Sequence, residues 1–238
     1  MGIADTEKPV GPCDYRLSDT EVGATLVEAL DDSDLEVRSF AASRLARDFE
    51  DTVVRFEAER IIRHVGEHSN TDAILLLGRT GSERASNLLL KDPQYARASR
   101  RETELALAKL GDEQLEDKFV SAFKEARGSA QKVQAARDLG YIGTRRACIA
   151  LAEQLRSPEM AGPRGEYSLR VAVIEALSQA LPGEKVLWRP TTPPTDDRYY
   201  ERIETWATNV LGVSWNTPRP PFFYRMAMPG KPLSAQPR

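Results

Sequence analysis

Aromatic side chains and cysteines are scarce in this chain of 238 residues. Phe, Trp and Tyr make up 7% of it, and its two cysteines, Cys13 and Cys148, lie far apart in the sequence. Two distant cysteines provide neither a disulfide framework nor a zinc-binding spacing, and they favour a reducing compartment. Few aromatics, with abundant Ala, Leu, Glu and Arg, are typical of closely packed helices rather than of a large β core. The composition therefore predicts an all-α protein.

Long apolar runs and an excess of one charge are also missing. No run approaches the roughly 20 apolar residues that span a bilayer, and the N-terminus lacks the pattern of a signal peptide. The formal net charge is −3, so no global field draws the whole chain to nucleic acid or to an anionic membrane. We expect a cytoplasmic protein without a membrane partner, in which any charged binding surface is local.

Three parts of the chain differ in composition. Residues 1–17 show no hydrophobic periodicity and are expected to form an N-terminal arm. Residues 18–181 have apolar positions every three to four residues, which predicts successive amphipathic helices. Residues 182–238 are rich in proline and aromatics, with one capping helix predicted at about 196–211. The tail after this helix could pack on the last helix pair, dock in a groove or neighbouring subunit, or be recognised by a partner.

Capping signals and apolar stripes set the expected helix bounds. Ser18 with Glu21, and Ser33 with Glu36, have the spacing of a capping box. In the second and third helices we expect the large apolar residues Leu35, Val37, Phe40 and Phe56 to face the core. The expected helices are residues 18–30, 33–46, 52–65, 71–77, 82–91, 93–110, 113–127, 130–142, 144–156 and 168–181.

A turn motif recurs along this helical part. The nonapeptide at 77–85 matches the one at 139–147 in the placement of its glycines, and a further copy of the turn lies at 108–115. Subtracting residue numbers puts Gly81, Gly111 and Gly143 30 and 32 residues apart, a period within the range of helical solenoids. We expect these glycines to adopt the left-handed backbone that ends a helix.

The best-preserved copy of the repeat lies at 133–155. Its apolar positions predict one helix that ends at a glycine, a short turn, and a second helix. In this interpretation Gly140, Gly143 and Ala147 are there to make a tight turn that can stack. Cys148 falls where the pattern needs a small buried residue, so we expect it to be packed in the core.

Two stretches carry a family resemblance. Val37-Arg38 followed by Ala41-Ala42 and Leu45, and the run 135–143 followed by Arg146-Ala147 and Leu151, resemble HEAT repeats of the bacterial type named after phycobilisome lyases. The resemblance covers roughly residues 19–181. It implies an α-solenoid, a right-handed superhelix of antiparallel helix pairs whose inner helices line a concave groove. It does not imply one activity, because the family includes scaffolds, chromophore handlers and a few enzymes.

Arginines recur on the helices that the resemblance places along the groove. A basic concave face on a nearly neutral molecule suits an acidic protein segment or a phosphate backbone. Alternatively, these arginines pair with neighbouring Asp and Glu. The candidate partner-binding residues are Arg38, Arg44, Arg60, Arg63, Arg97, Arg100, Arg101, Arg137 and Arg170.

The leading hypothesis is a non-catalytic, cofactor-free scaffold that binds an acidic segment of another protein on this face. The first alternative is a DNA-binding protein that uses the same face, as HEAT-like DNA-repair glycosylases do. The other is an enzyme, either lyase-like or metal-dependent: His64, Glu67 and His68 fit the H-x-x-E-H pattern of inverted zinc peptidases. Gly66 interrupts the helix which that pattern requires. We therefore favour the interpretation that these three residues are solvent-side residues at a helix end and bind no metal. The oligomeric state is left open.

Overall fold

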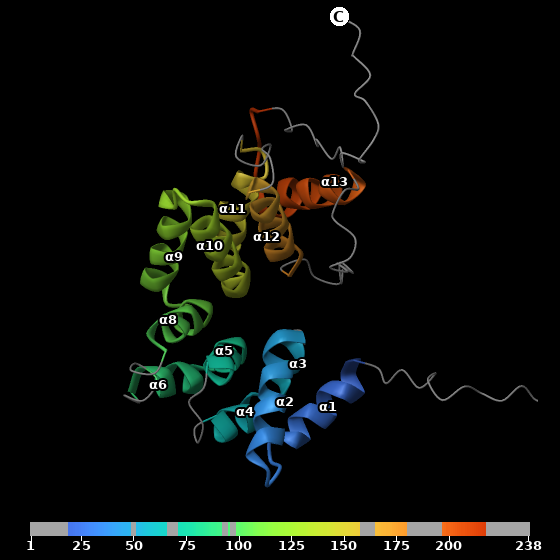
Figure 1. The fold of residues 1–238 in the computed structure, drawn as a ribbon, viewed down its shortest axis with the longest axis vertical. Helices are drawn as coiled ribbons and strands as arrows, with labels where there is room; N and C mark the ends of the chain where they lie inside the picture. Colours follow the sequence, from blue (N-terminus) through green and yellow to red (C-terminus); the bar gives the residue numbers. More distant parts are fainter. Residues whose placement is uncertain are drawn as a thin grey trace, which may run out of the picture. The chain divides into compact units, whose positions relative to one another are not determined.

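The described part of the chain is helical. The structure is a computed structural model, and it describes residues 19–48, 51–65, 71–91, 95, 99–157, 165–179 and 197–217, in which helices and short connections are present and no strand occurs. Contacts divide the chain into two compact units, residues 1–110 and 111–238, and each is described by itself. Figure 1 shows the helices of both. The predicted all-α class is therefore confirmed.

Unit 1 is built around helix α5, Thr71–Arg79, which packs against α2, α3, α4, α6 and α8. Most of α5 is buried, including Ile74, Leu76 and Leu77, and a helix with so wide an apolar face requires neighbours around it. The fully buried Tyr95 adds the largest core side chain of this unit. The other helices are α1 (Asp19–Ala29), α2 (Leu35–Asp48), α3 (Asp51–Phe56), α4 (Ala58–Val65), α6 (Glu83–Lys91) and α8 (Arg100–Lys109).

Unit 2 is built around the contact between α10, Ser129–Ile142, and α12, Gly165–Gln179. Helix α11, Arg145–Gln154, packs against both, and α9, Glu113–Glu125, packs against α10 and α11. Helix α13, Asp197–Trp206, contacts α12 and continues into a π-helical turn, η2 (Ala207–Leu211), which contacts α11. This helical stretch falls within the range expected for a capping helix.

Short polar side chains begin several helices. The carboxylate of Asp112 accepts hydrogen bonds from the amides of Gln114 and Leu115 at the start of α9, at 3.1 and 3.0 Å. Such caps satisfy amides that have no partner within the helix. At α2 the cap is Asp34, whose Oδ1 accepts from the amide of Glu36 at 2.8 Å. The predicted cap, Ser33, is therefore wrong by one residue.

The repeated turns have the predicted backbone. Gly81, Gly111 and Gly143 have φ values of 65°, 107° and 64°, in the left-handed region that favours glycine. Gly140 is different, because α10 runs through it to Ile142. The prediction that Gly140 forms part of the turn is wrong, whereas the helix predicted at 130–142 is confirmed.

The third expected helix is broken in two. Helices α3 and α4 replace the single helix predicted at 52–65, and Glu57 separates them. The carbonyl of Glu57 accepts from the amides of Arg60 and Ile61, at 3.1 and 3.0 Å, and so begins a new helical turn.

Four large apolar residues predicted to face the core are on the surface. The buried face of α2 is formed by the small residues Ala41 and Ala42 together with Leu45. The apolar stripe of α2 is wider than this face, so part of it is left in solvent. Exposed fractions are 53% for Leu35, 38% for Val37, 63% for Phe40 and 87% for Phe56.

None of the helices within the described residues is long and apolar enough to cross a membrane.

Gly140 allows α10 and α12 to approach closely. A Cβ at this position would lie 2.6 Å from the Cβ of Ala176 and 2.8 Å from its Cα, closer than real side chains come. Packed interiors do not absorb such overlap without moving the backbone. Gly140 therefore sets the spacing of the two central helices of unit 2.

Gly140→Ala is expected to lower the free energy of unfolding by about 1–3 kcal/mol through overpacking against Ala176. Intrinsic helix propensity acts in the opposite direction, because it favours alanine over glycine by about 1 kcal/mol. Urea unfolding of both single variants and of Gly140→Ala/Ala176→Gly measures the coupling, and the double variant should recover part of the loss. A Gly140→Ala protein more stable than the wild type would contradict this account.

Candidate functional site

Arg38 and Arg60 of the predicted arginine set both fasten the turn between α1 and α2. Nη1 of Arg38 donates to the carbonyls of Asp32 and Ser33, at 2.7 and 2.9 Å. Nε of Arg60, on α4, donates to Oδ2 of Asp31 at 2.7 Å. Turn carbonyls and a helix-end carboxylate are natural acceptors for the guanidinium group. These contacts give both arginines a role in holding unit 1 together.

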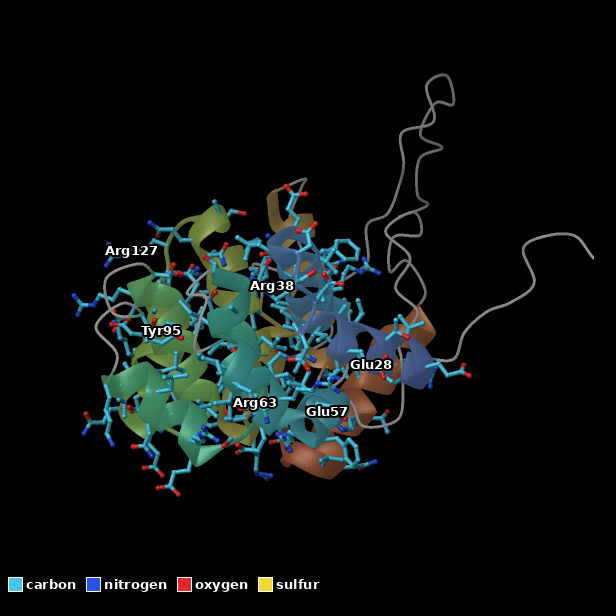
Figure 2. The ribbon with its side chains drawn as sticks, turned by 90° about the horizontal axis from the view of Figure 1, so that it is seen from below. Glu28, Arg38, Glu57, Arg63, Tyr95 and Arg127 are labelled. Carbon is cyan, nitrogen blue, oxygen red and sulfur yellow. The ribbon has the colours of Figure 1, made fainter. Side chains whose placement is uncertain are left out.

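Carboxylates surround Arg60. The hydrogen bond to Asp31 raises the pKa of Arg60, and the nearby charges of Asp31, Glu57 and Glu28 act in the same direction, while desolvation opposes them. Figure 2 labels Glu28 and Glu57. The local field is thus acidic, and an acidic partner segment at Arg60 would meet these carboxylates.

The two described arginines at the start of α8 have carboxylate partners on their own helix. Nε of Arg100 lies 3.1 Å from Oε1 of Glu104, one turn along, and Nη1 of Arg101 lies 3.7 Å from Oε1 of Glu102. The Arg100 side chain is 84% exposed. Exposed pairs contribute only about 0–1 kcal/mol, so such a side chain can turn to an external ligand at small cost.

Arg44 lies beside exposed apolar residues on α2. Val37, Phe40 and Arg44 are spaced three and four residues apart and are all exposed, so they share one face of the helix. Glu36 is exposed one turn before Phe40. We call Val37, Phe40 and Arg44 the α2 surface. Sequence reasoning found Arg44 but assigned the two apolar residues to the core.

Two candidates of unit 1 remain. Arg63 is exposed on α4, which packs against α5. Figure 2 labels Arg63 beside Glu57 in its view. Arg97 lies outside the described residues.

Arg137 and Arg170 belong to unit 2. Arg137 is exposed on α10, and its charge acts on Glu175 of α12, the helix that packs against α10. Burial raises the pKa of Glu175, and Arg137 opposes this by favouring the carboxylate. Arg170 is half-buried on α12. Arg137 therefore acts electrostatically on a carboxylate of the neighbouring helix.

The candidate metal ligands are not described by the structure. Glu67, His68 and the side chain of His64 lie outside the described residues, as does Cys13. Among the described residues, no group of three or more His, Cys, Asp or Glu side chains could hold a metal ion. Cys148 is 3% exposed, so the prediction that it is packed in the core is confirmed.

Sequence reasoning missed three arginines that bind backbone carbonyls. Arg79 is 8% exposed, and its Nη1 donates to the carbonyls of Leu45 and Ala46 in the last turn of α2, at 2.8 and 2.7 Å. In unit 2, Arg145 and Arg156 also donate to backbone carbonyls. A charged residue at the end of the apolar run in α5 was a signal for Arg79, but the spacing does not show which acceptor it meets.

Comparison of the sequence with models of protein families and with curated proteins finds no match. The site is therefore interpreted from its own geometry.

Removing the charge of Arg137 should raise the pKa of Glu175 further. Arg137 favours the carboxylate while burial disfavours it, so Arg137→Gln leaves the burial effect unopposed. Carboxyl ¹³C NMR titration of Glu175 in the wild type and the variant measures the change. The matched control is Arg127→Gln, another exposed arginine of unit 2. An unchanged titration in Arg137→Gln would mean that Arg137 does not act on Glu175.

Proposed function

We propose that the chain is a HEAT-like superhelix of antiparallel helix pairs that binds another protein and catalyses no reaction. Three features support the repeat: the helical composition of the described residues, the left-handed glycines at matching turns, and the packing of α10 against α12 on one side and α9 against α11 on the other. Alternate helices that contact each other are typical of stacked helix pairs.

The proposed partner is a protein segment that combines apolar and acidic side chains. The observation that carries this proposal is the exposure of Phe40, at 63%, and of Val37 on the same face as Arg44. Large apolar residues grouped on a surface are typical of protein-binding sites, and aromatic and arginine side chains dominate the energetics of such sites.

The order of charges on α2 defines the segment further. Glu36 lies one turn before Phe40, and Arg44 lies one turn after it. A partner segment would therefore place an apolar side chain on Phe40 and a carboxylate against Arg44, with its acid kept away from Glu36. This binding surface is smaller and more specific than a basic face formed by all nine arginines.

Selection of random peptides displayed on phage against the full-length protein tests the segment. Selected peptides should contain Asp or Glu within a few residues of a large apolar side chain. Phe40→Ser and Arg44→Glu should each weaken binding by about tenfold or more, corresponding to about 1.4 kcal/mol. The matched controls are Leu90→Ser and Lys91→Glu, exposed residues on α6 of the same unit. Equal losses in the controls, or peptides without acidic residues, would contradict the proposal.

Titration with short duplex DNA separates the proposal from the nucleic-acid alternative. Arg38 and Arg60 are engaged with groups of their own unit, and the sequence of unit 1 has more acidic than basic residues. We therefore expect no binding at about 50 mM salt, where phosphate contacts are strong. Binding that weakens steeply towards about 200 mM salt would instead favour a DNA-binding protein.

A further inference from the structure

Residues 212–217, which we call the strap, follow η2 and are not helical. In the strap, Val213 is buried and Trp215 is partly buried, whereas Gly212, Ser214 and Asn216 are exposed. Alternation with a period of two is typical of an extended segment that presents every second side chain to a surface. The strap therefore binds unit 2 through two side chains.

Gly212 turns the chain from η2 into the strap. Its φ is 76°, and a Cβ there would have no atom within 4 Å outside the adjacent residues. The amide of Val213 donates to the carbonyl of Ala207 at 3.2 Å, a hydrogen bond that closes a helix end on a left-handed glycine. A glycine in open space gives the strap a hinge.

Arg145 of α11 fixes the position of this hinge. Its Nη2 donates to the carbonyl of Leu211 at 2.9 Å, and its Nη1 donates to that of Val210 at 3.3 Å. Both acceptors belong to the π-helical turn, a rare element that often occurs at functional sites. The strap thus begins at a defined point beside α11.

Trp215 anchors the strap on α11. Its indole Nε1 donates to the carbonyl of Ala152 at 3.1 Å, and the guanidinium carbon of Arg156 lies 5.0 Å from the centroid of its ring. Nη1 of Arg156 also donates to the carbonyl of Thr217, at 3.0 Å. An aromatic anchor, a cation over its face and a backbone hydrogen bond are the contacts by which proteins hold extended peptides.

Arg156 is held in place independently of the strap. Its Nε and Nη2 lie 2.8 and 3.2 Å from the two carboxylate oxygens of Glu204 on α13, whose side chain is only 7% exposed. A bidentate pair fixes the plane of the guanidinium group. Helices α11 and α13 therefore form the surface that contacts Trp215, and the strap packs on this surface.

We propose that this surface, made by the carbonyl of Ala152, Arg156 and Glu204, is a binding site for an extended protein segment bearing a tryptophan. The strap of the same chain occupies it and can be displaced by swinging about Gly212. This site lies in unit 2 and is independent of the α2 surface, so either proposal can fail without the other.

A labelled synthetic peptide with the sequence of residues 211–217 tests the site. It should bind full-length Trp215→Ala, whose site is vacated, at least about tenfold more tightly than the wild type. It should not bind Arg156→Ala/Trp215→Ala, and a peptide with alanine for tryptophan should not bind any of the proteins. No binding to folded Trp215→Ala, or equal binding to the wild type, overturns the proposal.

Hydrogen exchange of full-length Trp215→Phe keeps the test valid if the alanine variant does not fold. Phenylalanine keeps an aromatic ring but cannot donate to the carbonyl of Ala152, so the strap should open more often. Amides of residues 212–217 should exchange faster while those of α11 keep the wild-type rate. Unchanged exchange in the strap, or faster exchange throughout α11, would show that Trp215 only stabilises unit 2 and would overturn the proposal.

Discussion

Carbonyl groups at helix ends need hydrogen-bond donors, and this chain supplies arginine for many of them. The last carbonyls of a helix have no partner within it, and short helices place many such groups close together. Arg38 serves the turn after α1, Arg79 the end of α2, and Arg145 the end of η2. Arg79 joins α5 to the end of α2, and Arg145 joins α11 to the end of η2. Arg38 instead closes the turn that precedes its own helix.

This use of arginine changes the interpretation of the charge pattern. A row of arginines on successive helices suggests a basic binding face, yet Arg38 and Arg60 are directed to groups of their own unit. On α2, exposed apolar side chains lie on the same face as Arg44. Specific recognition is more readily explained by this mixed surface than by net charge, because burial of Phe40 adds to the attraction of the cation.

The two proposed surfaces differ in whether another segment of the chain already covers them. The side chains of the α2 surface are exposed to solvent. The site on α11 is filled by the strap, and a partner must compete with a segment tethered at high effective concentration. A tethered competitor weakens the apparent affinity of any partner, which makes such a site suited to control.

Local chemistry let the sequence determine the helices, their approximate bounds, and the left-handed turns at Gly81, Gly111 and Gly143. Hydrophobic periodicity, capping residues and glycine all act within a few residues along the chain. The burial of Cys148 followed from the same periodicity.

Only the tertiary structure decided which apolar residues are covered and which acceptors the arginines meet. Helices α1 and α5 pack against α2, and Phe40 is exposed while Ala41 and Leu45 are buried. The role of Gly140 depends on the approach of Ala176 from a helix more than 30 residues away. Likewise, Arg156 meets Glu204 and Trp215 because α13 and the strap return to α11. Periodicity along one helix does not show which other segment packs against that helix. The contact with this segment determines which side chains are buried and which hydrogen bonds they form.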